Sequence, residues 1–402
     1  MLSAGKYDIV EEKNSNDFQC AKENKMKENS TFQYDKRDSQ STIVYPIASE
    51  KFDYAAYQEY DASLAERQQA FLKADSGILV YRRVRADGVF YDKCQNMKES
   101  LELQLGALQK SLEYQADIAN FLEPWYGIGY IAGCFGGTYE FPAGQAPVVK
   151  PMFHTIADLL AVDPKPIAQT PMGRHILEMT EYFMDKTKGR VPVSMTDIQA
   201  PVNMLSYLLP ITDLFMEVYD DPEGLAEASM LVADLLAEFL EKQRSIIGDA
   251  LAAPGHGFAS SRILKGIGLS DDNSIMVSEE DYRDCFQCAD EKLGDRFGGL
   301  VFHSCGNWEK KIPMVKKMNG IIMADGAFTQ QTDPSPNTPE IFRDAFTNSG
   351  IILNARAVGP DAEETFSRLY QKGMKLIAVT YCETAEEQTR LYRKLHEMET
   401  RE

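Results

Sequence analysis

The residues best suited to chemistry in this sequence are His303 and Cys305, which close the stretch GGLVFHSCGNW. The run before them is apolar and rich in β-favouring residues, so it predicts a strand that ends at this pair. Residues i and i+2 of an extended chain point to the same side, so the imidazole and the thiol should face one pocket. Such a pair can bind a metal ion or act in catalysis. A packed histidine beside a buried thiol has the same spacing, and only a further residue can decide.

That further residue is Cys382, which ends the last apolar run, MKLIAVTYC. We interpret this run as the final strand of a closed barrel, in which the ends of the later strands lie close together. His303, Cys305 and Cys382 would then form a nitrogen and two-sulfur set with one open position, the ligand pattern of catalytic zinc. Thiolates disfavour Mg²⁺ and Ca²⁺ and favour Zn²⁺ over Mn²⁺.

The elements that must position these residues are predicted from about residue 190 onward, where short apolar runs alternate with amphipathic segments. Repeated strand–helix units imply a parallel sheet, and strands that are apolar on both faces favour a closed (β/α)8 TIM barrel. No G-x-G-x-x-G motif follows a first strand, which weakens the open-sheet alternative. The predicted strands lie in GRVPVSMTDIQ, which begins as a strand and ends as a loop, and in GHGFASS, GGLVFHSCG, NGIIMADG, GIILNARAV and MKLIAVTYC.

The amino-terminal part of the chain has a different pattern. Residues 1 to about 45 are polar and lack periodicity, so they predict a loose leader ahead of a single barrel domain over residues 46–402. Residues 63–74 and 96–122 place apolar side chains three and four apart. These segments predict N-terminal helical additions to the barrel.

Polar residues occur at the carboxyl ends of the predicted strands, where barrels carry their chemistry. Besides the zinc ligands they are Asp197, Gln199, His256, Asp325, Asn354 and Arg356. We expect Gln199, His256, Asp325, Asn354 and Arg356 to line a substrate pocket, and Arg356 would suit a sulfonate or carboxylate. Two alternatives stay open: Asp197 after a strand can simply cap a helix, and His256 between two glycines can be structural.

Several motifs resemble the uroporphyrinogen decarboxylase superfamily. They are FHSCGN, GLSDDNSIMVSEEDYRDCF, VTYCET and EPWYGIGYIAGCFGGTYEF followed by APVVKP. The resemblance covers about residues 60 to 400, is strongest from 255 to 385 and leaves the leader unmatched. It is closest to the zinc-dependent methylcobalamin:thiol methyltransferases. In that branch an H-x-C pair and a distant cysteine bind zinc, which corresponds to His303, Cys305 and Cys382.

This resemblance implies a function. A small thiol would be activated on zinc, and its methyl donor would be a methylated corrinoid (methylcobalamin type) on a separate corrinoid-carrying protein. Asp271 and Asp272 in GLSDDNS look like a superfamily motif. Asp271, Asp272 and Asp197 are the candidate catalytic residues. Asp271 and Asp272 would orient the site or supply a fourth zinc ligand. Alternatively, the two aspartates only cap the following helix.

Two other functions are compatible with the resemblance. A divergent decarboxylase would need an RxxGR stretch, an early Asp and a late His, whereas this chain offers VYRRVRADG, Glu123 and Cys382 at those places. Without those arginines a polycarboxylate substrate is poorly held, which disfavours a metal-free carboxy-lyase. The other alternative is a non-catalytic corrinoid- or metal-binding member of a methyl-transfer complex.

Composition excludes further classes. The 402 residues are 44% hydrophobic and 26% charged, as in ordinary globular proteins. A formal net charge of −19 repels nucleic acid and anionic membranes. No apolar run approaches the roughly 18 to 20 residues that span a bilayer, and the amino terminus lacks a hydrophobic signal core, so we expect a cytoplasmic protein. The seven cysteines are too scattered for a disulfide framework.

Overall fold

The computed structural model describes residues 41–86 and 88–400. The predicted polar leader, residues 1 to about 45, lies almost wholly outside the described residues. No helix in the described ranges combines the length and the apolar character needed to cross a membrane.

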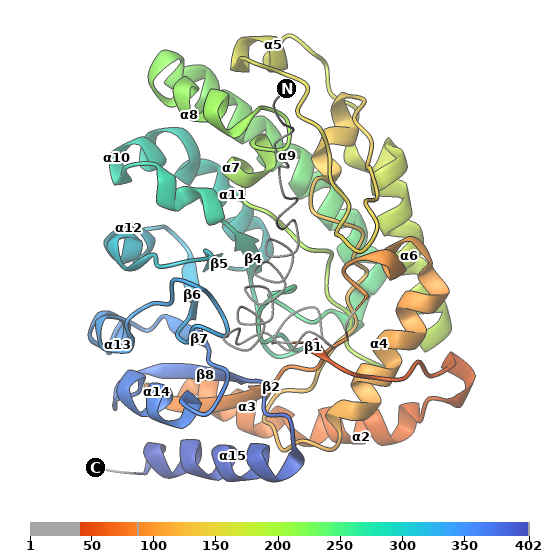
Figure 1. The fold of residues 1–402 in the computed structure, drawn as a ribbon, viewed down its shortest axis with the longest axis vertical. Coiled ribbons are helices and arrows are strands. Elements are labelled where there is room, and N and C mark those ends of the chain that lie inside the picture. Colours follow the sequence, from red (N-terminus) through yellow and green to blue (C-terminus); the bar gives the residue numbers. More distant parts are fainter. Residues whose placement is uncertain (1–40, 87, 401–402) are drawn as a thin grey trace, which may run out of the picture.

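A six-stranded parallel sheet forms the centre of the fold, with the strand order β2-β8-β7-β6-β5-β4. Every neighbouring pair in this sheet is parallel. The strand that comes first along the chain, β2, pairs with the strand that comes last, β8 (Figure 1). The strands are β2 Gly77–Arg82, β4 Ile267–Ser270, β5 Leu300–His303, β6 Ile321–Ala327, β7 Ile352–Arg356 and β8 Lys375–Thr380. A small separate sheet pairs β1 Ser41–Thr42 with β3 Arg85–Ala86.

Extended segments connect β2 to β4 on the remaining side of the ring. Single parallel bridges join Leu122 to Val193, Val193 to Leu251, and Gln199 to Ser270. The Asp117 N–H donates to the carbonyl of Val80 at 2.7 Å, which attaches this wall to β2. The α/β barrel class is as predicted. Six strands form its continuous sheet, and bridged segments continue the wall.

Two predicted strands are wrong in detail. GRVPVSMTDIQ forms only the isolated bridges at Val193 and Gln199, because Pro192 has no N–H to add to a ladder. GHGFASS forms turns, since Gly255 and Gly257 have φ values of 124° and 83° that a strand does not use. Strands β2 and β4 were not predicted.

Helices cover the outside of the sheet (Figure 1). The predicted helix over residues 96–122 ends early, at Ser111, because the chain then enters the barrel wall at Asp117. The helices are α2 Tyr54–Ser63, α3 Ala65–Lys73, α4 Met97–Ser111, α5 Ile156–Leu160, α6 Pro171–Thr187, α7 Pro201–Leu205, α8 Ile211–Asp220, α9 Pro222–Ile247, α10 Glu279–Tyr282, α11 Cys288–Phe297, α12 Ile312–Val315, α13 Pro339–Phe346, α14 Ala362–Leu369 and α15 Ala385–Glu399.

Alternation along the strands separates two apolar layers. One layer fills the inside of the ring, and its members from the strands are Leu79, Tyr81, Val301, Met323, Ile352, Ile377, Val379 and, just past β8, Tyr381. The other layer packs between the sheet and the helices, and its members include Ile78, Val80, Leu300, Phe302, Ala324, Leu353, Leu376 and Ala378. Because side chains alternate along a strand, this division fixes which strand-end residues face the barrel mouth.

Candidate functional site

Three side chains with metal-binding atoms meet at the ends of β4 and β5. Ligand atoms of Asp272, His303 and Cys305 all lie within 4.8 Å of one another. The Cys305 sulfur is 3.4 Å from Nε2 of His303, and Oδ1 of Asp272 is 3.6 Å from the same nitrogen. The backbone N–H of Cys305 also donates to Oδ1 of Asp272 at 2.6 Å. The imidazole and the thiol therefore lie against each other, and Asp272 joins them.

A buried carboxylate orients His303. Nδ1 of His303 lies 2.6 Å from Oδ2 of Asp325, which is 1% exposed. Asp325 is held in turn by the Asn354 amide and by Nε of Arg356 at 3.1 Å. With Nδ1 engaged, Nε2 is the nitrogen that faces the thiol. A ligating histidine whose second nitrogen binds a carboxylate is the usual arrangement at metal sites.

The surroundings of His303 and Asp325 favour the charged form of both side chains. Burial works against the imidazolium, but hydrogen bonds to Asp325 and Cys305 raise the pKa of His303 well above its ordinary value. Burial likewise opposes the Asp325 carboxylate, but Arg356 and His303 lower the pKa of Asp325. The predicted pocket residues Asp325, Asn354 and Arg356 thus lie together, directly behind His303.

Asp271 has different surroundings from its neighbour Asp272. It is 1% exposed, and its carboxylate contacts the hydroxyl of Tyr282, which also contacts Asp290. Burial raises the pKa of Asp271 to about 7. Its backbone N–H donates to the carbonyl of His303 at 2.7 Å. Asp271 therefore anchors the end of β4 to the helix layer, while Asp272 contacts the Cys305 backbone.

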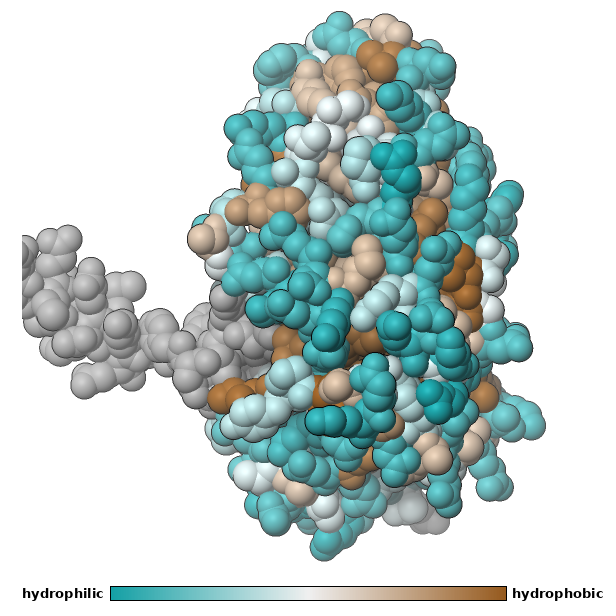
Figure 2. Space-filling model, turned by 90° about the vertical axis from the view of Figure 1, so that its right-hand side faces the viewer, coloured by the Kyte–Doolittle hydropathy of each residue, from teal (hydrophilic) through white to brown (hydrophobic). Residues whose placement is uncertain are grey.

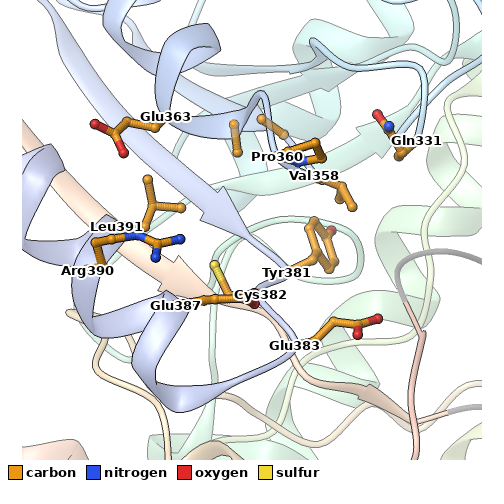
Figure 3. Close-up of a pocket in the computed structure, with 13 residues that line it drawn as sticks. Gln331, Val358, Pro360, Glu363, Tyr381, Cys382, Glu383, Glu387, Arg390 and Leu391 are labelled. Carbon is orange, nitrogen blue, oxygen red and sulfur yellow. The ribbon is translucent and has the colours of Figure 1, made fainter.

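Cys382 lies on the other face of its strand end. Ile377, Val379 and Tyr381 face the inside of the ring, whereas Cys382 continues the row of Leu376 and Ala378 toward the helices. Cys382 lines a cavity of about 530 Å³ (Figure 3), and within the described residues it is not part of the group formed by Asp272, His303 and Cys305. Burial raises the pKa of its thiol. Zinc binding by Cys382 stays a prediction, and it requires the residues after β8 to turn.

A second polar group lies at the bridged side of the ring. Nδ1 of His256 contacts Glu123, and Nε2 of His256 lies 3.3 Å from Oδ2 of Asp197. The indole N–H of Trp125 donates to the same Asp197 oxygen at 3.1 Å. Burial would raise the pKa of Glu123, but His256 and Arg83 lower it. His256 thus has a carboxylate at each ring nitrogen, and Glu123 and Arg83 are site residues that were not predicted.

The two polar groups are connected. The Gln199 amide donates to Oδ1 of Asp197 at 2.9 Å, and the Asn203 amide donates to Oε1 of Gln199 at 3.0 Å. Asn203 also reaches Oδ2 of Asp272 at 3.4 Å. Asn203 was not predicted; its position four residues after Gln199, at the start of α7, was the available signal. The mouth of the ring therefore has a continuous polar arc.

Comparison with known proteins agrees with this architecture. The uroporphyrinogen decarboxylase family model matches residues 72–254, whereas the motif resemblance was strongest over later residues. Among solved structures, a methyltransferase from Methanosarcina mazei matches with a TM-score of 0.57 at 14% identity, covering 84% of this chain and 99% of that chain. At this identity the likeness concerns the fold. No curated protein was found to match the chain. Over residues 72–254, the chain is therefore similar to the uroporphyrinogen decarboxylase family.

Proposed function

We propose that the protein is a zinc-dependent methyltransferase that moves a methyl group from a corrinoid to a thiol. The observation that carries this proposal is the group of Asp272, His303 and Cys305, whose ligand atoms lie within 4.8 Å of one another at a barrel mouth. The superfamily match and the fold shared with a methyltransferase support the reaction class.

The three side chains fit zinc by their chemistry. They offer an imidazole nitrogen, a thiolate sulfur and a carboxylate oxygen, and three protein ligands with an open fourth position are typical of catalytic zinc. A thiolate and a carboxylate together balance the two charges of Zn²⁺. Asp325 supplies the second-shell carboxylate at His303 Nδ1. Cys382 would complete the set or replace Asp272 once the residues after β8 turn.

The residues of this chain have separable tasks. Asp325 holds Nδ1 and leaves Nε2 available as a ligand, while Arg356 and Asn354 hold Asp325. Asp272 fixes the backbone of Cys305. When bound, zinc would supply a Lewis acid that keeps the acceptor thiol deprotonated, and a corrinoid on a partner protein would supply the methyl group.

Metal analysis combined with a transfer assay tests the proposal. We expect the purified protein to bind about one zinc per chain and to demethylate methylcobalamin when a small thiol is added. His303→Ala, Cys305→Ser and Asp272→Asn should each lower both zinc content and transfer. Cys288→Ser is the matched control, since Cys288 is exposed on α11 away from the group.

The possible outcomes separate the alternatives. Full zinc and full transfer in Cys305→Ser would contradict the ligand assignment. Cys382→Ser decides whether that thiol joins the site. Metal-free turnover of a tetrapyrrole-like acid would favour a decarboxylase instead. Zinc without transfer to any thiol would favour a non-catalytic module.

A further inference from the structure

A cavity of about 340 Å³ lies at the end of the barrel away from the metal-binding side chains. One side of this cavity is formed by α2 and α3, and the other side by residues 261–263. Helix α3 leads into the amino end of β2, and residues 261–263 precede the amino end of β4, whereas the metal-binding side chains lie at the carboxyl ends of β4 and β5. Because the sheet is parallel, these are opposite ends of the barrel. The cavity is therefore separate from the candidate metal site.

Gln68 on α3 lines this cavity and has a buried acceptor without a partner. Its Oε1 atom makes no hydrogen bond within the described part of the chain, although Gln68 is only 1% exposed. The amide nitrogen of Gln68 donates to the carbonyl of Asp117 at 2.9 Å, and this contact fixes which end of the amide is the oxygen. A buried polar atom without a partner costs about 1 to 3 kcal/mol. The oxygen of Gln68 therefore calls for a hydrogen-bond donor in the cavity.

An ion pair forms a second polar part of the cavity lining. Oδ2 of Asp61 lies 2.6 Å from Nη1 of Arg262, and Nη2 of Arg262 donates to the carbonyl of Gly189 at 3.1 Å. The Asp61 side chain is 11% exposed, and burial raises its pKa above the ordinary value, although Arg262 opposes this shift. Asp61 would repel an anionic ligand, and Arg262 would repel a cationic one. The ion pair therefore favours a neutral ligand that donates to the carboxylate.

The lining between these polar groups is small and apolar. It includes Ala62, Ala65 and Ile263, and the two methyl side chains leave space that larger residues would fill. At its edge, the hydroxyl oxygen of Ser261 accepts the N–H groups of Ile263 and Leu264 at 3.1 Å each. Since the hydroxyl proton points away from these two amides, Ser261 can donate it to a ligand. The cavity thus combines two acceptors, one donor and an apolar floor.

We propose that this cavity binds a small neutral carboxamide carried on a flat ring. The NH2 group of a carboxamide has two donors, which match Oε1 of Gln68 and the carboxylate of Asp61. Its carbonyl oxygen accepts from the hydroxyl of Ser261, and the ring lies against Ala62 and Ala65. The volume of about 340 Å³ is near the lower end of the range for small-molecule sites. This ligand site goes beyond the proposed methyl transfer and does not depend on it.

Three ring compounds of nearly equal shape test this site: benzamide, acetophenone and benzoate. Acetophenone has a methyl group in place of the NH2 group of benzamide, and benzoate has a charged oxygen there. Calorimetric titration of the full chain should show that benzamide binds about tenfold more tightly than either of the others. Gln68→Met removes the unpartnered acceptor and should weaken benzamide binding by about tenfold. Ala65→Leu should fill the cavity and abolish binding.

Controls separate binding from folding. Ala70→Leu makes the same change at an exposed position of α3 outside the cavity, so the affinity for benzamide should not change. Thermal unfolding checks the fold of each variant, and Ala65→Leu should stay folded because Ala65 is a partly exposed helix position. Equal binding of benzamide and acetophenone, no binding of benzamide, or unchanged binding in Ala65→Leu would overturn the proposal. Because the titration reads neither zinc nor methyl transfer, failure of the proposed function would leave its result intact.

Discussion

At the residue scale, the candidate site depends on side chains that hold other side chains. The Tyr282 hydroxyl lies between the buried carboxyl groups of Asp271 and Asp290. A hydroxyl has one proton, so a second proton must reside on one of the two acids to complete both contacts. Burial favours this, since it raises the pKa values of Asp271 and Asp290. The end of β4, and with it Asp272, is thereby fixed to the helix layer.

Removal of this hydroxyl should be costly. In Tyr282→Phe two buried acids lose their shared partner, and we expect the free energy of unfolding to fall by about 2 kcal/mol. Chemical denaturation measures the loss, and Tyr219→Phe on the exposed side of α8 is the control, because Tyr219 is 75% exposed. Equal stability of the two variants would show that the hydroxyl does not hold the acids.

Part of the site was predictable residue by residue. His303 and Cys305 share a side because they are two apart at a strand end, and the sequence shows this directly. The face of Cys382 was not predictable in the same way, because the register of β8 decides that Tyr381 faces inward. Arg83 and Tyr381 become neighbours only through the pairing of β2 with β8, which no local pattern reveals.

At the element scale, the last helix, α15, is hydrogen-bonded to β2, the first strand of the main sheet. Glu399 on α15 accepts the Ile78 N–H at 2.7 Å, and Asp117 accepts the Val80 N–H at 2.7 Å. Asp117 also binds the hydroxyl of Tyr392 at 2.7 Å and Nε2 of His396 at 3.0 Å. Side-chain carboxylates therefore take part in bonding β2 where a neighbouring strand would normally supply carbonyls.

The contacts of His396 with Asp117 and Glu399 should make the stability of the fold depend on pH. Burial opposes the charged form of His396, and so does Arg67, whose Nη2 lies 2.6 Å from Nδ1 of His396, but Asp117 and Glu399 outweigh them and raise the pKa of His396 above its ordinary value. A histidine whose pKa is higher in the folded than in the unfolded protein stabilises the fold when it is protonated. This stabilisation is complete below the pKa of the unfolded protein, about 6.5, and is lost as the pH rises through the pKa of the folded protein. We expect His396→Gln to cost about 1 to 2 kcal/mol at pH 5 and clearly less at pH 9.

Denaturant titrations of both proteins at the two pH values measure this difference. His154→Gln is the control, because the His154 side chain is 82% exposed. A loss of stability that is the same at pH 5 and pH 9 would contradict an ionised His396.

The long, periodic elements were the predictable ones. Helix α9 begins at Pro222, and the Asp221 side chain accepts the Gly224 N–H at 3.0 Å, a start that an Asp-Pro pair ahead of an amphipathic run makes predictable. Helix α15 begins at Ala385 with a capping box of Thr384 and Glu387, and the sequence shows this Thr-x-x-Glu pattern directly. The wall between β2 and β4 was not predictable as observed, because prolines and glycines leave it with isolated bridges instead of ladders.

At the scale of the whole molecule, the ring has an unevenly bonded wall. Strand β8 is paired on both sides, with β2 and with β7, whereas the segments around Leu122 and Val193 have single bridges. Hydrophilic residues cover most of the face shown in Figure 2, with apolar side chains in small groups between them. With a net charge of −19, the exclusion of nucleic acid as a ligand stays a prediction.

Hydrogen exchange of backbone amides should show the difference between the paired strands and the bridged segments. Backbone amides of β8 should be well protected, because two ladders hold them, and amides of residues 117–122 and 191–199 should exchange sooner. Exchange followed by mass spectrometry of peptides resolves the two regions. Equal protection in both regions would mean that the bridged segments are bonded as firmly as the strands.

The pairing of β2 with β8 also sets the order in which the protein can be completed during synthesis. Gly77 pairs with Lys375, so the strand made early has no lateral partner on that side until almost the whole chain has left the ribosome. Until then β2 and β7 present open edges, the form in which sheets associate wrongly with other chains. Arg83 and Tyr381 likewise become neighbours only after β8 has paired with β2.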